Sequence, residues 1–241
     1  MNLKALKDLP LDPTLIAQSH SDTIRRKLQK LSVMEMKTFY KVSEKVAQNT
    51  YEMLHTQKTG SAIDLFEGLV FKNLNYDTLD TGGKSYVDNH VIIASALYGL
   101  VTPLQHIMPY RLDLDNPLII DHQPLSTYWR KSITNTLIKH RSEIIVDLAS
   151  EEYSQLVDWE TLKKKKTVLK IEFKELRDGK WTSVSTYSKM ARGQLMRQAA
   201  FTNAQNIEDI HNISVMGYAY MSQSLAPASK DGISVALFSK S

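Results

Sequence analysis

The stretch at residues 91–114, VIIASALYGLVTPLQHIMPYRLDL, decides how the rest of the sequence is interpreted. It opens with four apolar residues, 91–94, a run too short for a helix that packs alone but suited to a strand buried on both faces of a sheet. Small residues then lead to Gly99, where the chain can turn tightly. Pro103 starts a short amphipathic helical segment, 104–108, and a second proline ends it.

Tyr110 and Arg111 follow this segment at once. They are expected to place an aromatic ring and a cation just outside the carboxyl end of the strand. In open α/β sheets this is where ligands usually bind. The plainer interpretation, a core strand with an exit loop, is the one that the physics of these residues favours.

Length and composition describe an ordinary folded protein. The 241 residues can bury a substantial core, as one large α/β domain or two small ones. No apolar run approaches the roughly 20 residues that span a bilayer, and the start has no signal-peptide pattern. The chain has no cysteine, which excludes disulfides, thiolate metal sites and iron–sulfur ligation. These features are typical of a cytoplasmic protein without a membrane partner.

Positive charge is concentrated in one part of the sequence. Residues 160–200 carry 11 Lys or Arg against 4 Asp or Glu, a net +7, although the whole chain carries only +4. A local basic field attracts polyanions.

Hydrophobic periodicity predicts an α/β or α+β fold in which a mixed sheet is flanked by helices, over a single domain at 1–241. Ser32 and Glu35 have the spacing of a capping box. Segment 62–71 fits either a short helical turn or a strand broken at Gly68. Segment 76–90 fits either a helix or a loop. Helices are expected at 13–31, 32–54, 125–139, 188–205 and 207–211. Strands are expected at 118–120, 144–148, 168–176, 181–187, 215–221 and 233–238, with a hairpin turn at 177–180.

The helix at 188–205 is the main candidate for binding. Lys189, Arg192 and Arg197 share one half of its surface, and Gly193 would let a backbone approach. The break at Asn206 and the short helix after it complete a helix–hairpin–helix-like outline, a module that can grip the nucleic-acid backbone. A solvated basic surface explains the same pattern equally well. A stripe of small and apolar residues on another side is expected to pack inward: Ala191, Leu195 and Ala199.

Other charged clusters have plainer explanations. The helix at 13–31 has a basic face formed by Arg25, Arg26, Lys27 and Lys30, and four lysines follow one another at 163–166. Both clusters are expected to be solvated, with DNA contact as the sharper alternative. Glu151 and Glu152 suit the start of a helix, where the dipole stabilises carboxylates, or an acid–base pair. The seven histidines are scattered, so no metal site is expected. No cofactor motif is present, and no cofactor is expected.

A series of different short motifs follows along most of the chain. They are Phe66-x-Gly68-x-x-Phe71, Ala96-Leu97-Tyr98-Gly99, Pro103-Leu104, Pro109-Tyr110-Arg111-Leu112, Tyr128-Trp129, Ile133-Thr134-Asn135, Leu148-Ala149-Ser150-x-Glu152-Tyr153, Lys189-x-Ala191-Arg192-Gly193 and Gly217-Tyr218. In this order they resemble the YaaA family of bacterial peroxide stress proteins, most clearly over residues 39–241.

The resemblance implies a cytoplasmic protein of the peroxide stress response that binds DNA and limits damage by unincorporated iron. The sequence departs from the family in two places. Thr102 stands where members usually have a basic residue, which would make a cleft less positive. The family's N-terminal strand also has no counterpart, so we expect the natural start to lie upstream of Met1.

The leading hypothesis is nonspecific or structure-selective DNA binding in a basic cleft. It would use Lys189, Arg192 and Arg197, helped by Arg111 and Tyr110.

The rival hypothesis is an enzyme that acts on a small phosphorylated or carboxylated molecule in the same cleft. Arg111, Lys189 and Arg192 would hold the anion, and Glu151 or Glu152 would serve as acid or base. A third hypothesis is an interaction protein without ligand chemistry.

Overall fold

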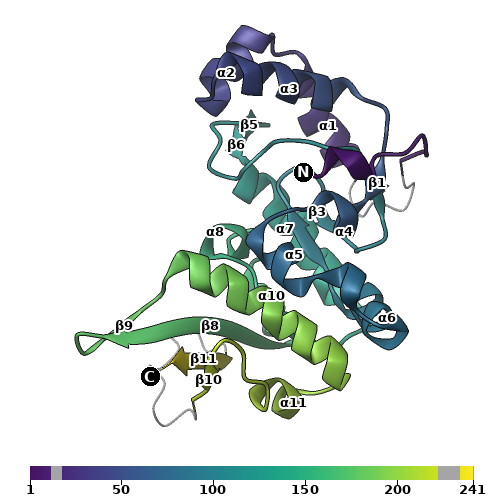
Figure 1. Cartoon of the computed structure of the whole chain (residues 1–241). Helices are drawn as coiled ribbons and strands as arrows, with labels where there is room; N and C mark the ends of the chain where they lie inside the picture. Colours follow the sequence, from purple (N-terminus) through teal and green to yellow (C-terminus); the bar gives the residue numbers. More distant parts are fainter. Residues whose placement is uncertain (12–17, 222–233, 241) are drawn as a thin grey trace. The chain divides into compact units, whose positions relative to one another are not determined.

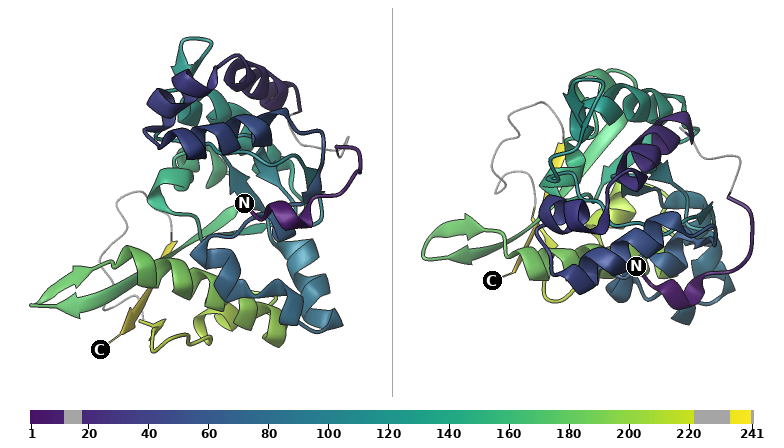
Figure 2. Two further views of the ribbon diagram at one scale, coloured as in Figure 1. Left: turned by 45° about the horizontal axis from the view of Figure 1, so that its top comes forward. Right: turned by 90° about the horizontal axis from the view of Figure 1, so that it is seen from above.

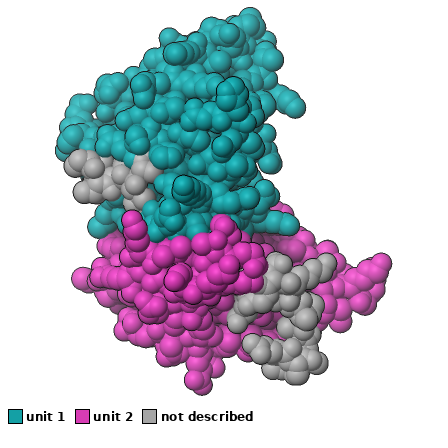
Figure 3. Space-filling view, turned by 180° about the vertical axis from the view of Figure 1, so that it is seen from behind, with its two compact units in different colours: residues 1–66, 92–136, 151–157 teal, residues 67–91, 137–150, 158–241 magenta. Residues whose placement is uncertain are grey.

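The computed structural model describes residues 1–11, 18–221 and 234–240. The chain divides into two compact units, each assembled from three stretches (Figure 3). Unit 1 comprises 1–66, 92–136 and 151–157, and unit 2 comprises 67–91, 137–150 and 158–241. The expectation of a single domain over 1–241 stays a prediction. Among the described helices, none combines the length and apolarity needed to cross a membrane.

The helices of unit 1 begin and end at local signals. Ser32 and Glu35 form the predicted capping box at the start of a helix. The single helix expected at 32–54 is wrong, because Lys41 is left-handed (φ 52°) and Ser43 caps a new helix. The helices are α1 (Gln18–Gln29), α2 (Val33–Tyr40), α3 (Glu44–His55), α4 (Ala62–Leu65), α8 (Glu151–Ser154) and α7 (Leu125–Lys139), which belongs to unit 1 up to residue 136, together with the 3-10 turn η1 (Leu3–Ala5). Residues 13–17 of the helix expected at 13–31 lie outside the described residues.

The strands of unit 1 pair only as short antiparallel ribbons: β1 (Gly60–Ser61) with β4 (His106–Ile107), β2 (Ile93–Ser95) with β3 (Gly99–Val101), and β5 (Ile119–Ile120) with β6 (Gln123–Pro124). The prediction that 91–94 is a central strand is therefore wrong, because β2 pairs with the segment that follows it. The helix expected at 104–108 is also wrong, because β4 pairs with β1 there. The extended piece at 118–120 is confirmed as β5.

The turn between β2 and β3 confirms the tight turn predicted at Gly99. Gly99 has φ 72°, and a Cβ on it would lie 2.8 Å from the Trp129 ring. Trp129 is fully buried, and its Nε1 donates to Ala96 O at 2.9 Å. Ser95 Oγ accepts a hydrogen bond from Tyr98 N across the same turn. The absence of a side chain at Gly99 therefore lets the turn pack directly against the buried Trp129 ring in the core of unit 1.

Unit 2 contains the predicted mixed sheet. Its described strands run in the order β10 (Ala219–Tyr220), β11 (Ser234–Lys240), β8 (Thr167–Arg177), β7 (Ile144–Asp147). The central pairings, β11 with β8 and β8 with β7, are parallel, whereas β10 pairs antiparallel with β11. The fifth strand, β9 (Lys180–Thr182), folds back on β8 as an antiparallel hairpin that extends away from the helices of unit 2 (Figure 2).

The hairpin confirms the turn predicted at 177–180. Asp178 and Gly179 both have positive φ, as a two-residue hairpin turn requires. The second strand is shorter than expected, because the following helix already begins at Ser185. The strand expected at 215–221 is reduced to β10 and an isolated bridge between Val215 and Tyr218. The strand expected at 233–238 is confirmed as β11.

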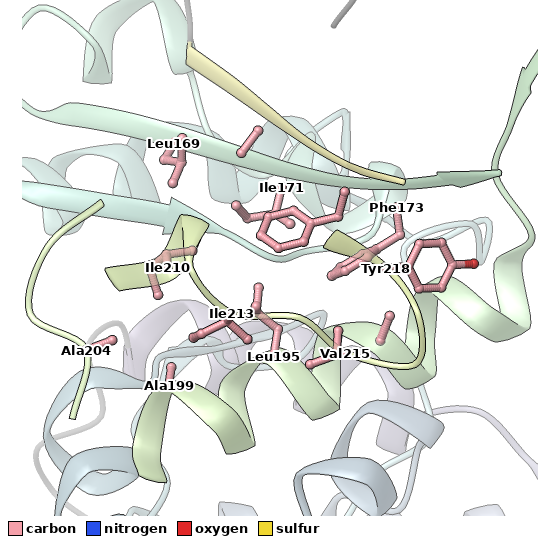
Figure 4. Packing of buried hydrophobic residues seen from close by; sticks show 13 residues of the cluster. Leu169, Ile171, Phe173, Leu195, Ala199, Ala204, Ile210, Ile213, Val215 and Tyr218 are labelled. Atoms are coloured by element: carbon pink, nitrogen blue, oxygen red, sulfur yellow. The ribbon is translucent and has the colours of Figure 1, made fainter. Parts of the chain in front are cut away.

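Helices cover the sheet of unit 2, which confirms a mixed sheet flanked by helices. β8 alternates, so that Leu169, Ile171 and Phe173 enter a core with α10 and the segment 204–218 (Figure 4). Both ambiguous segments prove helical over most of their length. The helices are α5 (Leu69–Leu74), α6 (Thr81–His90), α9 (Trp159–Leu162), α10 (Ser185–Thr202) and α11 (Ile207–His211), with the 3-10 turn η2 (Tyr76–Thr78).

Candidate functional site

Helix α10 of unit 2 carries three of the predicted phosphate-binding cations. Its stripe of Ala191, Leu195 and Ala199 is buried, as predicted, and packs toward β8. Gly193 faces α5, where an added Cβ would lie only 2.2 Å from Val70 O. The backbone that approaches Gly193 is therefore that of α5. Packing on two sides fixes the helix and the directions of its remaining side chains.

Lys189 is exposed on this helix. No ion pair joins it to a carboxylate among the described residues. It lies in the first half of α10, where the chain reaches the surface. Its ammonium group is thus available to an anion in solvent.

Arg197 is half-buried and held in place by α5. Its Nη1 donates to Leu74 O at 3.0 Å and to Asn75 O at 2.9 Å, at the C-terminal end of α5. A cation is favourable there because the last carbonyls of a helix carry partial negative charge. The guanidinium also lies 4.8 Å from the centroid of the Phe201 ring. Arg197 therefore has a structural role, and one face of its guanidinium is covered by an aromatic ring.

Arg192 lies in a more enclosed, acidic environment. Its Nε is buried and has no hydrogen-bond partner among the described residues. Burial lowers the pKa of Arg192, and the carboxylates of Asp147 and Glu172 oppose that shift. Asp147 is itself buried at the end of β7. The charge of Arg192 is thus partly offset before any ligand arrives, which weakens it as a phosphate ligand.

Tyr110 and Arg111 belong to unit 1 and differ in exposure. Tyr110 is only 7% exposed, and its hydroxyl lies 2.8 Å from Ser95 Oγ. Burial raises the pKa of Tyr110 well above its usual value. Arg111 is exposed. The expectation of an aromatic ring at the surface is therefore wrong, and only the cation of this pair reaches solvent.

Glu151 and Glu152 occupy the first turn of α8 in unit 1, as expected for helix N-terminal carboxylates. Glu151 is exposed, whereas Glu152 accepts a hydrogen bond from Leu114 N at 3.1 Å. Burial raises the pKa of the neighbouring Tyr153, and the carboxylates of Glu152 and Asp113 raise it further. This corner of unit 1 is acidic.

Two predictions about surface charge are wrong for one residue each, while the exposed members Arg26, Lys27, Lys30, Lys164 and Lys165 are as expected. Arg25 is buried and donates to Leu54 O at 2.7 Å and to Pro109 O at 3.3 Å. Lys166, the last of the four lysines, is also buried, and its Nζ donates to His140 O at 2.8 Å and Glu143 Oε1 at 3.2 Å. Each of these side chains donates hydrogen bonds to backbone carbonyl groups of another segment. Which carbonyl groups need such a donor depends on tertiary packing, so neighbouring residues do not indicate it.

Helix α10 is followed by a tight turn and a short helix, as the sequence predicts. Asn203 is left-handed, and Asn206 and Asp209 form a capping box at the start of α11. The second helix has only five residues. The structure shows a long helix, a turn and a short helix; a helix–hairpin–helix DNA motif stays a prediction and belongs to the proposal below.

Two surface hollows are lined by charged or aromatic side chains. One lies in unit 1 beside α1, has a volume of about 550 Å³ and includes Arg26, Lys27 and Lys30. The other lies in unit 2 between α6 and the end of α10, has a volume of about 510 Å³ and includes Phe201 and Arg141. Phe201 follows Arg197 by four residues, a spacing that brings side chains together on a helix and was readable in advance.

No three His, Asp or Glu side chains of the described residues are grouped so that they could hold a metal ion. Of the five predicted DNA-binding residues, the structure places three on one helix of unit 2 and two in unit 1. Lys189 and Arg111 are exposed, Arg197 is half-buried, Arg192 is offset by carboxylates and Tyr110 is buried.

Comparison with known proteins agrees with the resemblance read from the motifs. The family model described as "Peroxide stress protein YaaA" matches residues 3–224. A UPF0246 protein of Francisella tularensis subsp. novicida (strain U112) is 34% identical over 205 residues, which cover 80% of each chain. A UPF0246 protein of Francisella philomiragia subsp. philomiragia is 33% identical with the same coverage. The chain therefore belongs to the YaaA family of peroxide stress proteins.

Proposed function

We propose that this member of a peroxide stress family binds DNA, nonspecifically or structure-selectively, with Lys189 of α10 as the main phosphate contact and Arg192, Arg197 and Arg111 in supporting roles. By occupying DNA it would limit the oxidative damage that iron and peroxide cause there. The proposal includes a cytoplasmic location. It also includes the use of the α10–α11 outline as a helix–hairpin–helix grip on the phosphate backbone.

One observation carries the proposal: Lys189 is exposed and unpaired among the described residues, on a helix whose other sides are fixed by packing. A cation held on a rigid element can meet a phosphate without first breaking an ion pair. The surrounding sequence at 160–200 carries a net charge of +7. Such a field draws in polyanions from a distance and favours release of the counterions condensed on DNA.

Binding to a labelled duplex at several salt concentrations tests the proposal. We expect log affinity to fall linearly with log salt, and Lys189→Gln to reduce the slope by about 1, as loss of one phosphate contact requires. Lys45→Gln, on an exposed lysine of α3, is the matched control and is expected to leave the slope unchanged. An affinity that does not change with salt would refute DNA binding by phosphate contacts.

A small phosphorylated or carboxylated ligand is the second candidate, and one observation favours it. Arg192 keeps a buried Nε without a partner among the described residues, beside the buried Asp147. An anion reaching Arg192 would supply that partner. Calorimetry with inorganic phosphate tests this function. If phosphate binds, Arg192→Gln abolishes that binding and the wild-type protein shows no binding to DNA, the second proposal replaces the first.

A further inference from the structure

The hollow of unit 2 is lined by two helices and one loop, and is called the Phe201 hollow below. Its volume is about 510 Å³. One wall is α6, and the other is the C-terminal end of α10, which lies beside α6 in Figure 1. Arg141, from the segment after α7, completes the lining. The side chains that the argument uses are Tyr86, Asn89, His90, Arg141, Phe201 and Asn203.

A hydrogen bond joins the walls of the hollow, and two contacts within α6 fix the side chains of that wall. Tyr86 Oη donates to Ala204 O at 2.9 Å, which ties α6 to the turn after α10. The rings of Tyr86 and His90 are stacked with centroids 4.3 Å apart and planes 21° apart. His90 Nδ1 lies 2.9 Å from Tyr86 O. A site whose walls are already fixed loses little conformational freedom when a ligand enters.

Phe201 provides an aromatic surface at this hollow. The residue is 49% exposed, so its ring is open to a ligand that enters the hollow. The Arg197 guanidinium lies 4.8 Å from the ring centroid and is itself anchored to the end of α5. Among the described residues, no other ring packs on Phe201. An exposed ring held by an anchored cation is what nucleic-acid-binding proteins offer to a base.

The polar lining suits the edge and phosphate of a nucleotide. Asn89 Nδ2 already donates to Ser85 O at 2.7 Å, and Asn203 Oδ1 already accepts from Gln205 Nε2 at 2.9 Å. These amides therefore offer a base edge one acceptor, Asn89 Oδ1, and one donor, Asn203 Nδ2, while Arg141 offers an exposed cation for a phosphate. The one acidic side chain of the lining, Asp80, already accepts a hydrogen bond from Gly83 N at 2.7 Å. Its charge is therefore partly used in capping α6.

The Phe201 hollow lies on the same helix as the proposed phosphate contacts. Phe201 follows Lys189 by 12 residues of α10, a distance of about 18 Å along the helix axis. Successive phosphates of one strand in a duplex advance about 3.4 Å along its axis. At 100° per residue the two positions also lie about 120° apart around the helix, so a strand that meets Lys189 reaches the hollow after about five nucleotides only by passing partly around α10.

We propose that the Phe201 hollow binds an unpaired nucleobase of a DNA strand, stacked on Phe201 with a neighbouring phosphate at Arg141. The inference rests on the proposed DNA binding and makes it structure-selective. A base in a regular duplex is stacked and paired, and must be unstacked before it can enter such a site. A bulged or single-stranded base needs no such step, so DNA with unpaired bases binds more tightly than the matched duplex.

Affinities for a bulged oligonucleotide and its matched duplex test this inference, with 2-aminopurine at the bulge as a fluorescent probe. We expect wild type to prefer the bulge and to change the probe's fluorescence on binding. Phe201→Ala and Phe201→Leu are expected to reduce the preference roughly tenfold, as loss of one base-stacking contact implies, while Phe201→Tyr retains it. Tyr187→Ala removes another exposed aromatic of α10, outside the hollow, and is the matched control.

The outcomes separate the two proposals. If bulged and duplex DNA bind equally, or if Phe201→Ala leaves the preference intact, the inference is wrong while salt-dependent DNA binding stands. If no DNA binds at all, the proposed function fails first. Free deoxyadenosine monophosphate forms a further arm: binding at the hollow as tight as that of the bulged strand would assign the site to a small nucleotide and overturn the DNA assignment. Melting curves check that each variant is folded.

Discussion

Gly193→Ala is expected to destabilise the contact between α10 and α5. The new Cβ would lie 2.2 Å from Val70 O, 2.8 Å from Asn73 Cβ and 2.9 Å from Leu74 N. Two of these three atoms belong to the backbone of α5, so a change of rotamer cannot relieve the clash. Reaching an ordinary contact of 3.4 Å requires a movement of about 1.2 Å at Val70 O.

The magnitude follows from two opposing effects. Overpacking of this kind costs about 1–3 kcal/mol, while alanine in a helix interior gains up to about 1 kcal/mol over glycine. We therefore expect a net loss of about 1–2 kcal/mol in the free energy of unfolding. For a chain of this length each kcal/mol lowers Tm by roughly 2–4 °C. The loss should be larger if α5 cannot move as a body.

Thermal and urea unfolding followed by far-UV circular dichroism measures this loss. Gly82→Ala is the matched control, because a Cβ on Gly82, in the first turn of α6, would have Asp80 Oδ1 as its nearest neighbour at 3.6 Å. The control should be as stable as wild type or slightly more so. If Gly193→Ala proves equally stable, the packing of α10 on α5 is looser than the distances imply, and the rigidity argued for Lys189 is wrong.

Three further changes have expected outcomes. Lys166→Ala removes a buried ammonium group and leaves the part-buried His140 carbonyl without its donor, which should cost about 1–3 kcal/mol in urea unfolding. Lys164→Ala, at an exposed lysine, should stay within about 0.5 kcal/mol of wild type. Burial and the hydrogen bond to Glu175 raise the pKa of Tyr218 to about 12, so its contribution to stability is present below pH 10 and lost as pH rises toward 12. The pKa values of several other tyrosines are raised as well, so the check is a difference titration: if Tyr218→Phe does not remove one tyrosine from the signal that appears near pH 12, the prediction is wrong. Ser32→Ala removes one half of a capping box and should lower Tm by an amount equivalent to about 1 kcal/mol.

Local signals predicted local structure well. The capping box at Ser32, the hairpin turn at Asp178 and Gly179, and the alternation of β8 depend on residues a few positions apart, and all three are confirmed. The central strand predicted at 91–94 is wrong, because residues within the run do not determine which strand it pairs with. An apolar run looks alike in a central strand and in a hairpin, and only its pairing with β3 distinguishes the two.

The sequence predicts those features of the candidate site that depend on the geometry of α10 alone. Lys189 is exposed, as helix geometry implied, because the buried stripe fixes the rotation of α10. The environment of Arg192 depends on Asp147 and Glu172, which lie on two strands distant in sequence. The Phe201 hollow likewise requires α6 to lie beside the end of α10. Such neighbours are set by tertiary packing, which helical periodicity does not report.

The interleaved make-up of the two units constrains how the chain can acquire its structure during synthesis. Unit 1 draws its last stretch from 151–157, so an emerging chain cannot complete that core until more than half of the protein has left the ribosome. Unit 2 begins at residue 67 but includes β8, at Thr167–Arg177, and β11, at Ser234–Lys240, so its central parallel pairing waits for nearly the whole chain. Truncation at any single point therefore interrupts at least one unit, and evolutionary exchange of either unit as a cassette would need several simultaneous cuts.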